Sequence, residues 1–210
     1  MTKKSVNQNG KYVQELINSI EPDFIFSNKP INRFNVIEKN NNIENLNKTE
    51  LLSDLRDQIS SIENCNLKNN SKNLVMGDGD INSPIVLIGE TPGKIEDSSG
   101  LAFQGDVGSL LKKMLFAINI KIEKVYLTYS INFRPPEDRK PTAQEIKRYS
   151  VFLKKHISII NPKIIILMGS TAMETLMGST SRISSERGKW KEIILKDKTF
   201  PLLITFSPSY

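Results

Sequence analysis

Hydrophobic residues in the C-terminal two-thirds of the chain gather in four short runs. The first run ends at Gly89, and an apolar run that stops at a glycine is typical of a buried parallel strand. The runs predict strands at residues 85–88, 125–128, 164–168 and 202–205.

Amphipathic stretches lie between these runs. Apolar side chains recur on one face of residues 105–119 and of residues 143–160, which predicts two helices. A third helix is predicted to end at Met177, with Ser170 or Thr171 as its N-cap. Strands that alternate with helices form parallel sheets covered on both faces. The sequence therefore predicts an α/β fold, a three-layer α/β/α sandwich around a mostly parallel four-stranded sheet.

The N-terminal part of the chain combines segments of helical apolar spacing with polar runs. Residues 12–20 and 51–62 have the apolar spacing of helices. Residues 1–11 and the asparagine-dense run at 40–47 offer little to bury, so we expect both to be mobile. We expect residues 1–64 to form a partly mobile helical extension, and residues 65–210 to form the main domain.

The composition of the chain limits the classes of function that it can have. The 29 basic and 23 acidic residues give a net charge of +6, which favours a polyanionic partner such as nucleic acid. Cys65 is the only cysteine, which excludes an internal disulfide and a four-cysteine metal site and fits a reducing cytoplasm. The sequence has no basic and apolar leader and no long apolar stretch. We therefore expect a protein that is neither secreted nor inserted in a membrane.

The predicted strands all end at one rim of the sheet, where ligands of parallel sheets bind. Residues 89–93, Gly-Glu-Thr-Pro-Gly, follow the first strand, and their glycines let the backbone turn tightly and expose N–H groups. A loop without a ligand can have the same composition. Glu96, Asp97 and Phe103 follow just ahead of a helix and are candidates for the wall of a pocket that holds a planar polar ring.

These motifs, taken together, resemble the type-4 uracil-DNA glycosylases over about residues 65–210. The resemblance also includes Arg134, Pro135, Pro136, Arg139, Pro141 and residues 187–190, Arg-Gly-Lys-Trp. Phe133 stands where many members have a cysteine, which is most similar to an alphaproteobacterial branch of the family. The resemblance implies hydrolysis of the bond between uracil and deoxyribose, on a nucleotide swung out of the DNA stack into a pocket.

The same resemblance implies a role for each residue of the first motif. Phe103 matches the ring that stacks on the base. Glu90 matches the acidic residue that orients water or stabilises the cationic sugar, and Gly89 and Thr91 place backbone around the base. The alternatives are a core phenylalanine for Phe103 and a solvated loop carboxylate for Glu90.

Two positions depart from the family pattern. Tyr129 replaces an asparagine that reads the edge of uracil, and a phenol offers one hydroxyl on a bulky ring that can fill the pocket. Ser207 replaces the histidine of a His-Pro motif, and losing one preorganised donor of this kind costs about 10²–10³ in rate. We expect Glu90 and Ser207 to be the catalytic residues of a weakened active site.

The family's iron–sulfur cluster is also affected. The resemblance places its four cysteines near Cys65, Lys68, Phe133 and Tyr149, of which only the first is a thiol. We predict that the protein has no cluster, no other metal and no cofactor. Apolar packing of Phe133 and Tyr149 is expected to replace the metal.

Two basic loops are predicted to contact DNA. Arg134 and Arg139 lie on one of them, and Arg187 and Lys189 on the other, beside Trp190. The alternative is that both are ordinary surface turns. His156 is predicted to be an exposed helix residue rather than a catalyst.

Two hypotheses remain open. The first is a monomeric uracil-DNA glycosylase of base-excision repair, acting on DNA that contains uracil or another damaged base. The alternative is a catalytically impaired relic that binds damaged or single-stranded DNA. A nucleotide-binding α/β protein is a third possibility, but no phosphate-loop lysine motif follows any strand.

Overall fold

The computed structural model describes residues 33–178 and 180–209. The chain divides into two compact units, residues 1–40 and 41–210. Of the first unit the structure describes residues 33–40, which begin helix α2 (Arg33–Ser60). The helix predicted at residues 12–20 and the polar residues 1–11 lie outside the described residues, and the domain boundary at residue 64 stays a prediction.

Helix α2 confirms the helical periodicity of residues 51–62, although it ends at Ser60. The asparagine-dense run at 40–47, expected to be mobile, is part of this helix. None of the helices in residues 33–178 and 180–209 is long and apolar enough to cross a membrane.

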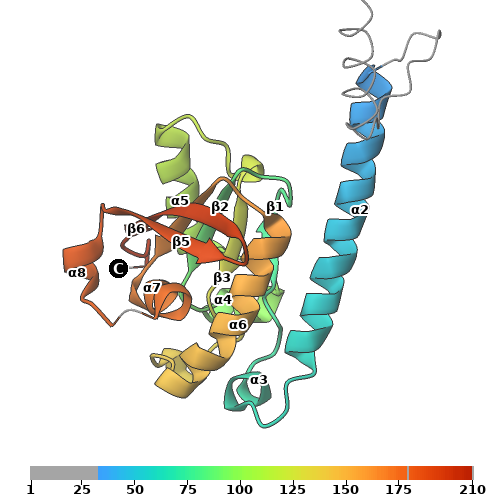
Figure 1. Ribbon diagram of the computed structural model, residues 1–210. Coiled ribbons are helices and arrows are strands. Elements are labelled where there is room, and N and C mark those ends of the chain that lie inside the picture. Colours follow the sequence, from blue (N-terminus) through green and yellow to red (C-terminus); the bar gives the residue numbers. More distant parts are fainter. Residues whose placement is uncertain (1–32, 179, 210) are drawn as a thin grey trace, which may run out of the picture. The chain divides into compact units, whose positions relative to one another are not determined.

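A six-stranded sheet lies at the centre of residues 41–210 (Figure 1). Its four parallel middle strands confirm the four predicted ones: β3 (Tyr126–Tyr129), β2 (Ile85–Gly89), β4 (Ile164–Met168) and β6 (Lys198–Thr205), in that order across the sheet. Two antiparallel strands, β1 (Gly77–Gly79) and β5 (Trp190–Leu195), flank them at the edges.

The prediction of a mostly parallel four-stranded sheet was therefore wrong, because the sheet is mixed. Strand β1 consists of two glycines around Asp78, and strand β5 alternates exposed and partly buried positions. Neither edge strand has the continuous apolar run of a strand buried on both faces.

Helices α5 (Gly105–Ala117), α6 (Ala143–Ile160) and α7 (Ser170–Met177) confirm the three helices predicted between the strands. Thr142 and Glu145 form a capping box at the start of α6, in which each side chain bonds the other residue's backbone N–H. Three shorter α-helices, α3 (Asn66–Asn70), α4 (Lys94–Ser99) and α8 (Ile183–Glu186), and two 3-10 helices, η1 (Ile122–Lys124) and η2 (Pro136–Asp138), complete the described set.

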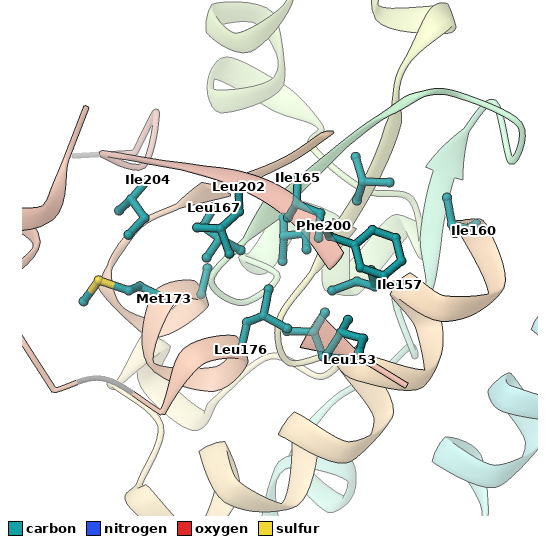
Figure 2. Close-up of a cluster of buried hydrophobic side chains, with 14 of the residues drawn as sticks. Leu153, Ile157, Ile160, Ile165, Leu167, Met173, Leu176, Phe200, Leu202 and Ile204 are labelled. Carbon is teal, nitrogen blue, oxygen red and sulfur yellow. The ribbon is translucent and has the colours of Figure 1, made fainter. Parts of the chain in front are cut away.

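Both faces of the sheet are covered, which confirms the three-layer sandwich. One face packs on α6 and α7, whose apolar side chains meet those of β4 and β6 (Figure 2). The other face, which includes Leu87 and Leu127, packs on Leu111 and Leu115 of α5. The period-two alternation along β2 produces this division, because Val86 and Ile88 face α6 and α7 whereas Leu87 faces α5.

His156 was predicted to be exposed, and the structure corrects this. Its side chain is 3% exposed, and its Nε2 lies 2.8 Å from the hydroxyl of Tyr126. Burial lowers the pKa of His156 to about 4, so the ring is neutral at pH 7. The position has the helical spacing of the buried Leu153, Ile157 and Ile160, which the flanking lysines hid from the sequence pattern.

Candidate active site

A cavity of about 240 Å³ opens at the carboxyl ends of the parallel strands. It is lined by residues 89–93 and by Glu96, Phe103, Val107, Tyr129, Asp138, Ser207 and Ser209. All six predicted catalytic and base-binding residues meet here: Gly89, Glu90, Thr91, Phe103, Tyr129 and Ser207. Parallel pairing explains the convergence, since Gly89 at the end of β2 lies opposite Tyr129 at the end of β3.

Glu90 is held by the N-terminus of helix α7. Its Oε1 accepts hydrogen bonds from the backbone N–H of Thr171 at 2.8 Å and from the hydroxyl of Ser170 at 3.2 Å. A helix N-terminus favours a negative charge, so this carboxylate is positioned rather than loosely solvated. The prediction that Ser170 or Thr171 caps α7 was wrong, because Gly169 is at the N-cap and Glu90 supplies the acceptor.

Gly169 makes this contact possible. Its φ is 106°, and a Cβ at this position would lie 2.3 Å from Cδ of Glu90. Any larger residue would therefore push the carboxylate away from the helix, in addition to straining the backbone.

Phe103 and Tyr129 form a stacked pair at one side of the cavity. Their ring centroids are 4.7 Å apart with an angle of 16° between the planes. The Tyr129 hydroxyl also accepts a hydrogen bond from the backbone N–H of Phe103 at 3.1 Å. Phe103 is 6% exposed and Tyr129 is 5% exposed, and both also belong to the apolar cluster that includes Leu87.

The acidic pair Glu96 and Asp97, in the first turn of helix α4, holds backbone segments in place. Both oxygens of Glu96 accept backbone hydrogen bonds at 3.0 Å, one from Gly93 and one from Gln104. Asp97 accepts from the backbone of Lys72 and of its neighbour Asn73. Glu96 lines the cavity as predicted, whereas Asp97 does not line it and instead ties helix α4 to the segment before β1.

Ser207 lies just beyond the end of β6 and is half-buried. Its Oγ is 2.7 Å from Oγ of Ser209, and it accepts a hydrogen bond from the Ser209 backbone N–H at 3.3 Å. The hydroxyl therefore reaches the cavity from a tight turn in which Ser209 is its partner.

The first basic loop is organised by ion pairs. Arg134 bonds both oxygens of Asp138 at 2.7 and 2.6 Å, and Arg139 bonds both oxygens of Glu145 at 2.9 and 2.8 Å. The Arg134 guanidinium holds the pKa of Asp138 below its usual range. Asp138 lines the cavity but was missed from the sequence, although its spacing of four residues from Arg134 is a recognisable charge pair.

The second basic loop lies between α8 and β5. Arg187 is exposed and its guanidinium lies 4.8 Å from the centroid of the Phe206 ring, next to Ser207. Lys189 is also exposed, with its Nζ 3.7 Å from Glu186. Trp190 begins β5 rather than belonging to a loop, and it is 60% exposed.

Three of the four positions at which the resemblance places the cluster cysteines contact one another through Tyr149. Sγ of Cys65 is 3.5 Å from the hydroxyl of Tyr149, and the rings of Phe133 and Tyr149 meet edge to face at 6.5 Å. The Lys68 ammonium donates to the carbonyl of Ile62. One thiol, two aromatic rings and an ammonium do not fit an iron–sulfur cluster, which needs several thiolates. The described residues also contain no cluster of three or more His, Cys, Asp or Glu able to hold a metal ion.

Comparison with known proteins finds several uracil-DNA glycosylases among the relatives of this chain. The family model of the uracil DNA glycosylase superfamily matches residues 76–210. The type-4 uracil-DNA glycosylase of Thermotoga maritima is 35% identical over 164 residues, which cover 78% of this chain and 84% of that protein. The type-4 enzyme of Archaeoglobus fulgidus is 32% identical, over 76% of this chain and 82% of that protein. That of Pyrobaculum aerophilum is 30% identical, over 75% of this chain and 83% of that protein. This chain therefore belongs to the type-4 uracil-DNA glycosylases, within the uracil DNA glycosylase superfamily.

Proposed function

We propose that this protein hydrolyses the N-glycosidic bond of uracil in DNA and thereby begins base-excision repair. We further propose that its rate is below that of relatives with asparagine and histidine in place of Tyr129 and Ser207. The observation that carries the proposal is the cavity at the strand ends, because it joins a positioned carboxylate, an aromatic ring and a hydroxyl donor.

The proposed chemistry follows from charge. A nucleotide extruded from the stack places its sugar and base in the cavity. As the glycosidic bond breaks, the sugar becomes cationic and uracil leaves as an anion. The Glu90 carboxylate, held by α7, either orients the attacking water or stabilises the cationic sugar, while the Ser207 hydroxyl donates a hydrogen bond to the leaving base. Gly89, Thr91 and Phe103 surround the base.

The DNA backbone is proposed to contact Arg134, Arg139, Arg187 and Lys189. Three of these cations have carboxylate partners in the protein, at side chains that are partly or largely exposed. Exposed ion pairs of this kind contribute about 0–1 kcal/mol, so a DNA phosphate can compete for the same cations. The net charge of +6 supports the same partner.

We propose that the protein works as a cytoplasmic monomer without an iron–sulfur cluster or another cofactor. The single cysteine supports this, because Lys68, Phe133 and Tyr149 cannot supply thiolates. We also propose that the chain belongs to the alphaproteobacterial branch of the family, which the phenylalanine at position 133 supports. Residues 65–210 are the proposed glycosylase domain.

A second candidate is a DNA-binding relic that recognises damaged or single-stranded DNA without cleaving the bond. The contact between Tyr129 and Phe103 favours it, because the ring that should stack on a base is already covered.

An assay of uracil release decides between the glycosylase and the relic. The protein is incubated with a uracil-containing oligonucleotide, and release is detected by alkaline strand cleavage. The best variant is Glu90→Gln, since its amide oxygen can still accept from Thr171 N–H while the negative charge is lost. We expect the wild type to cleave and Glu90→Gln to be slower by about 100-fold, with a Tm lower by no more than about 4 °C because the charge at the helix end is lost. A wild type that binds the oligonucleotide without cleaving it would establish the relic.

A further inference from the structure

The stacked pair at the cavity leaves no space for a base between its rings. Aromatic rings in offset contact have centroids about 4.5–7 Å apart. The separation of 4.7 Å between Phe103 and Tyr129 is at the short end of that range. A nucleobase stacked on this face of Phe103 would need the volume that the Tyr129 ring fills.

Tyr129 also uses a polar group of the pocket. The Phe103 backbone N–H donates to the phenol oxygen, and Phe103 holds this position with a φ of 50°, which is uncommon for a bulky residue. Backbone N–H groups in pockets fix the orientation of polar ligands. The Tyr129 ring thus covers the stacking surface of Phe103. Its hydroxyl occupies the Phe103 N–H, a donor that an extruded base would otherwise use.

The end of strand β2 supports the pair from one side. A Cβ on Gly89 would lie 2.8 Å from Cζ of Phe103 and 2.9 Å from Cδ1 and Cε1 of Tyr129. The backbone of Tyr129 is fixed by its pairing with Gly89 in the sheet. Tyr129 can therefore leave the stack only by a movement of its side chain.

We propose that Tyr129 is a plug that occupies the base-binding position on Phe103. In the closed form the remaining cavity, beside Glu90, Thr91 and Ser207, accommodates a deoxyribose that carries no base. A base enters only when the Tyr129 ring leaves Phe103. This inference rests on the proposed function insofar as it takes an extruded DNA nucleotide as the ligand.

The plug determines which nucleotide the site prefers. A base-bearing nucleotide must break the stack and the hydrogen bond between Tyr129 and Phe103, whereas a base-free nucleotide leaves both intact. The site should therefore bind abasic DNA, the product of uracil removal, more tightly than DNA that still contains the base.

Binding to two oligonucleotides tests the plug. One carries a tetrahydrofuran abasic analogue, and the other carries 2′-fluoro-2′-deoxyuridine at the same position, where the fluorine disfavours the cationic sugar and keeps the base attached. Fluorescence anisotropy should give a wild-type Kd about ten-fold or more lower for the abasic analogue. Tyr129→Phe, which keeps the ring, should retain the preference, and Tyr129→Ala should remove or reverse it.

Several results would overturn the proposal. The wild type could bind the uridine analogue as tightly as the abasic one, or it could bind neither oligonucleotide. Alternatively, the Tyr129→Ala variant could keep the preference of the wild type unchanged. Tyr129→Leu replaces the ring by an apolar side chain and serves if the alanine variant does not fold. Uracil release from ordinary deoxyuridine is measured separately. A wild type that prefers abasic DNA but releases no uracil would contradict the proposed function and leave the plug standing.

Discussion

The Glu90 carboxylate accepts a hydrogen bond from the Thr171 backbone N–H at 2.8 Å, so a loop that follows β2 supplies the N-terminal acceptor of helix α7. This contact joins two segments that are far apart in the sequence and holds the proposed catalytic group against a positive helix end. Gly169 is the residue that allows it.

Gly169→Ala should therefore displace Glu90. We expect uracil release to fall by about as much as for Glu90→Gln, about 100-fold, with a loss of about 1–3 kcal/mol in the free energy of unfolding. Gly178→Ala is the matched control, because Gly178 also has a positive φ, of 67°, but a Cβ there meets nothing within 4 Å. Urea unfolding and uracil release measure the two effects, and full activity in Gly169→Ala would contradict the assigned role.

The double substitution Tyr129→Asn and Ser207→His should increase uracil release. Asparagine offers a donor and an acceptor side by side, and histidine restores a longer donor near the leaving base. Each preorganised donor is worth about 10²–10³ in rate, so even partial recovery gives a gain of about ten-fold or more. Ser209→His, at another lining position of the same cavity, is the control and should not produce the gain. An unchanged rate in a folded double variant would argue against this account of the weakened site.

Iron analysis of the purified protein should find no stoichiometric iron, because one thiolate does not hold a cluster. About four irons per chain would refute this prediction.

The aromatic packing of Phe133 and Tyr149 should instead stabilise the fold at this place. Tyr149 is fully buried, and Tyr149→Ala should reduce the free energy of unfolding by about 3–5 kcal/mol. Tyr149→Phe, which loses the hydroxyl that contacts Cys65, should lose only about 1 kcal/mol, as measured by urea unfolding.

His156 should make stability depend on pH. Its pKa is about 4 in the folded protein and ordinary, near 6.5, in the unfolded chain. Between these values the unfolded chain binds the proton and the folded protein does not, so stability is present above about pH 6.5 and is lost as pH falls towards 4, by up to about 3 kcal/mol. Urea unfolding at several pH values should show a flatter profile for His156→Gln. Tyr126→Phe keeps the histidine and should retain the slope, and equal slopes in wild type and His156→Gln would disprove the assignment.

Arg187 and Lys189 should contribute to DNA affinity through phosphate contacts. Alanine at either position should weaken binding to any sequence and reduce the slope of log Kd against log salt concentration by about one. Lys196→Ala is the control, because Lys196 is exposed at the opposite end of the hairpin formed by β5 and β6. The prediction fails if the Lys196 variant loses as much affinity as the other two.

The four parallel strands and the helices between them could be predicted from the sequence, because the patterns that indicate them are local. The four apolar runs became the parallel strands, and the bounds of α6 and β4 agree with the predicted ranges. The edge strands were not readable, since β1 has no apolar residue and β5 is half exposed. Likewise, residues 89–93 and Phe103 were recognised as a motif, and the parallel topology brought them to one rim with Tyr129 and Ser207.

The amino-acid sequence by itself determined the periodicity of the strands and helices, the family, and the presence of a single cysteine. The tertiary structure decided what each polar group in the site does. Glu90 caps α7, Tyr129 covers Phe103, and Arg134 and Arg139 are bound by carboxylates. The reason is physical: apolar periodicity is set by neighbouring residues. A hydrogen bond or a ring stack depends on distances between segments, and these exist only once the sheet has formed.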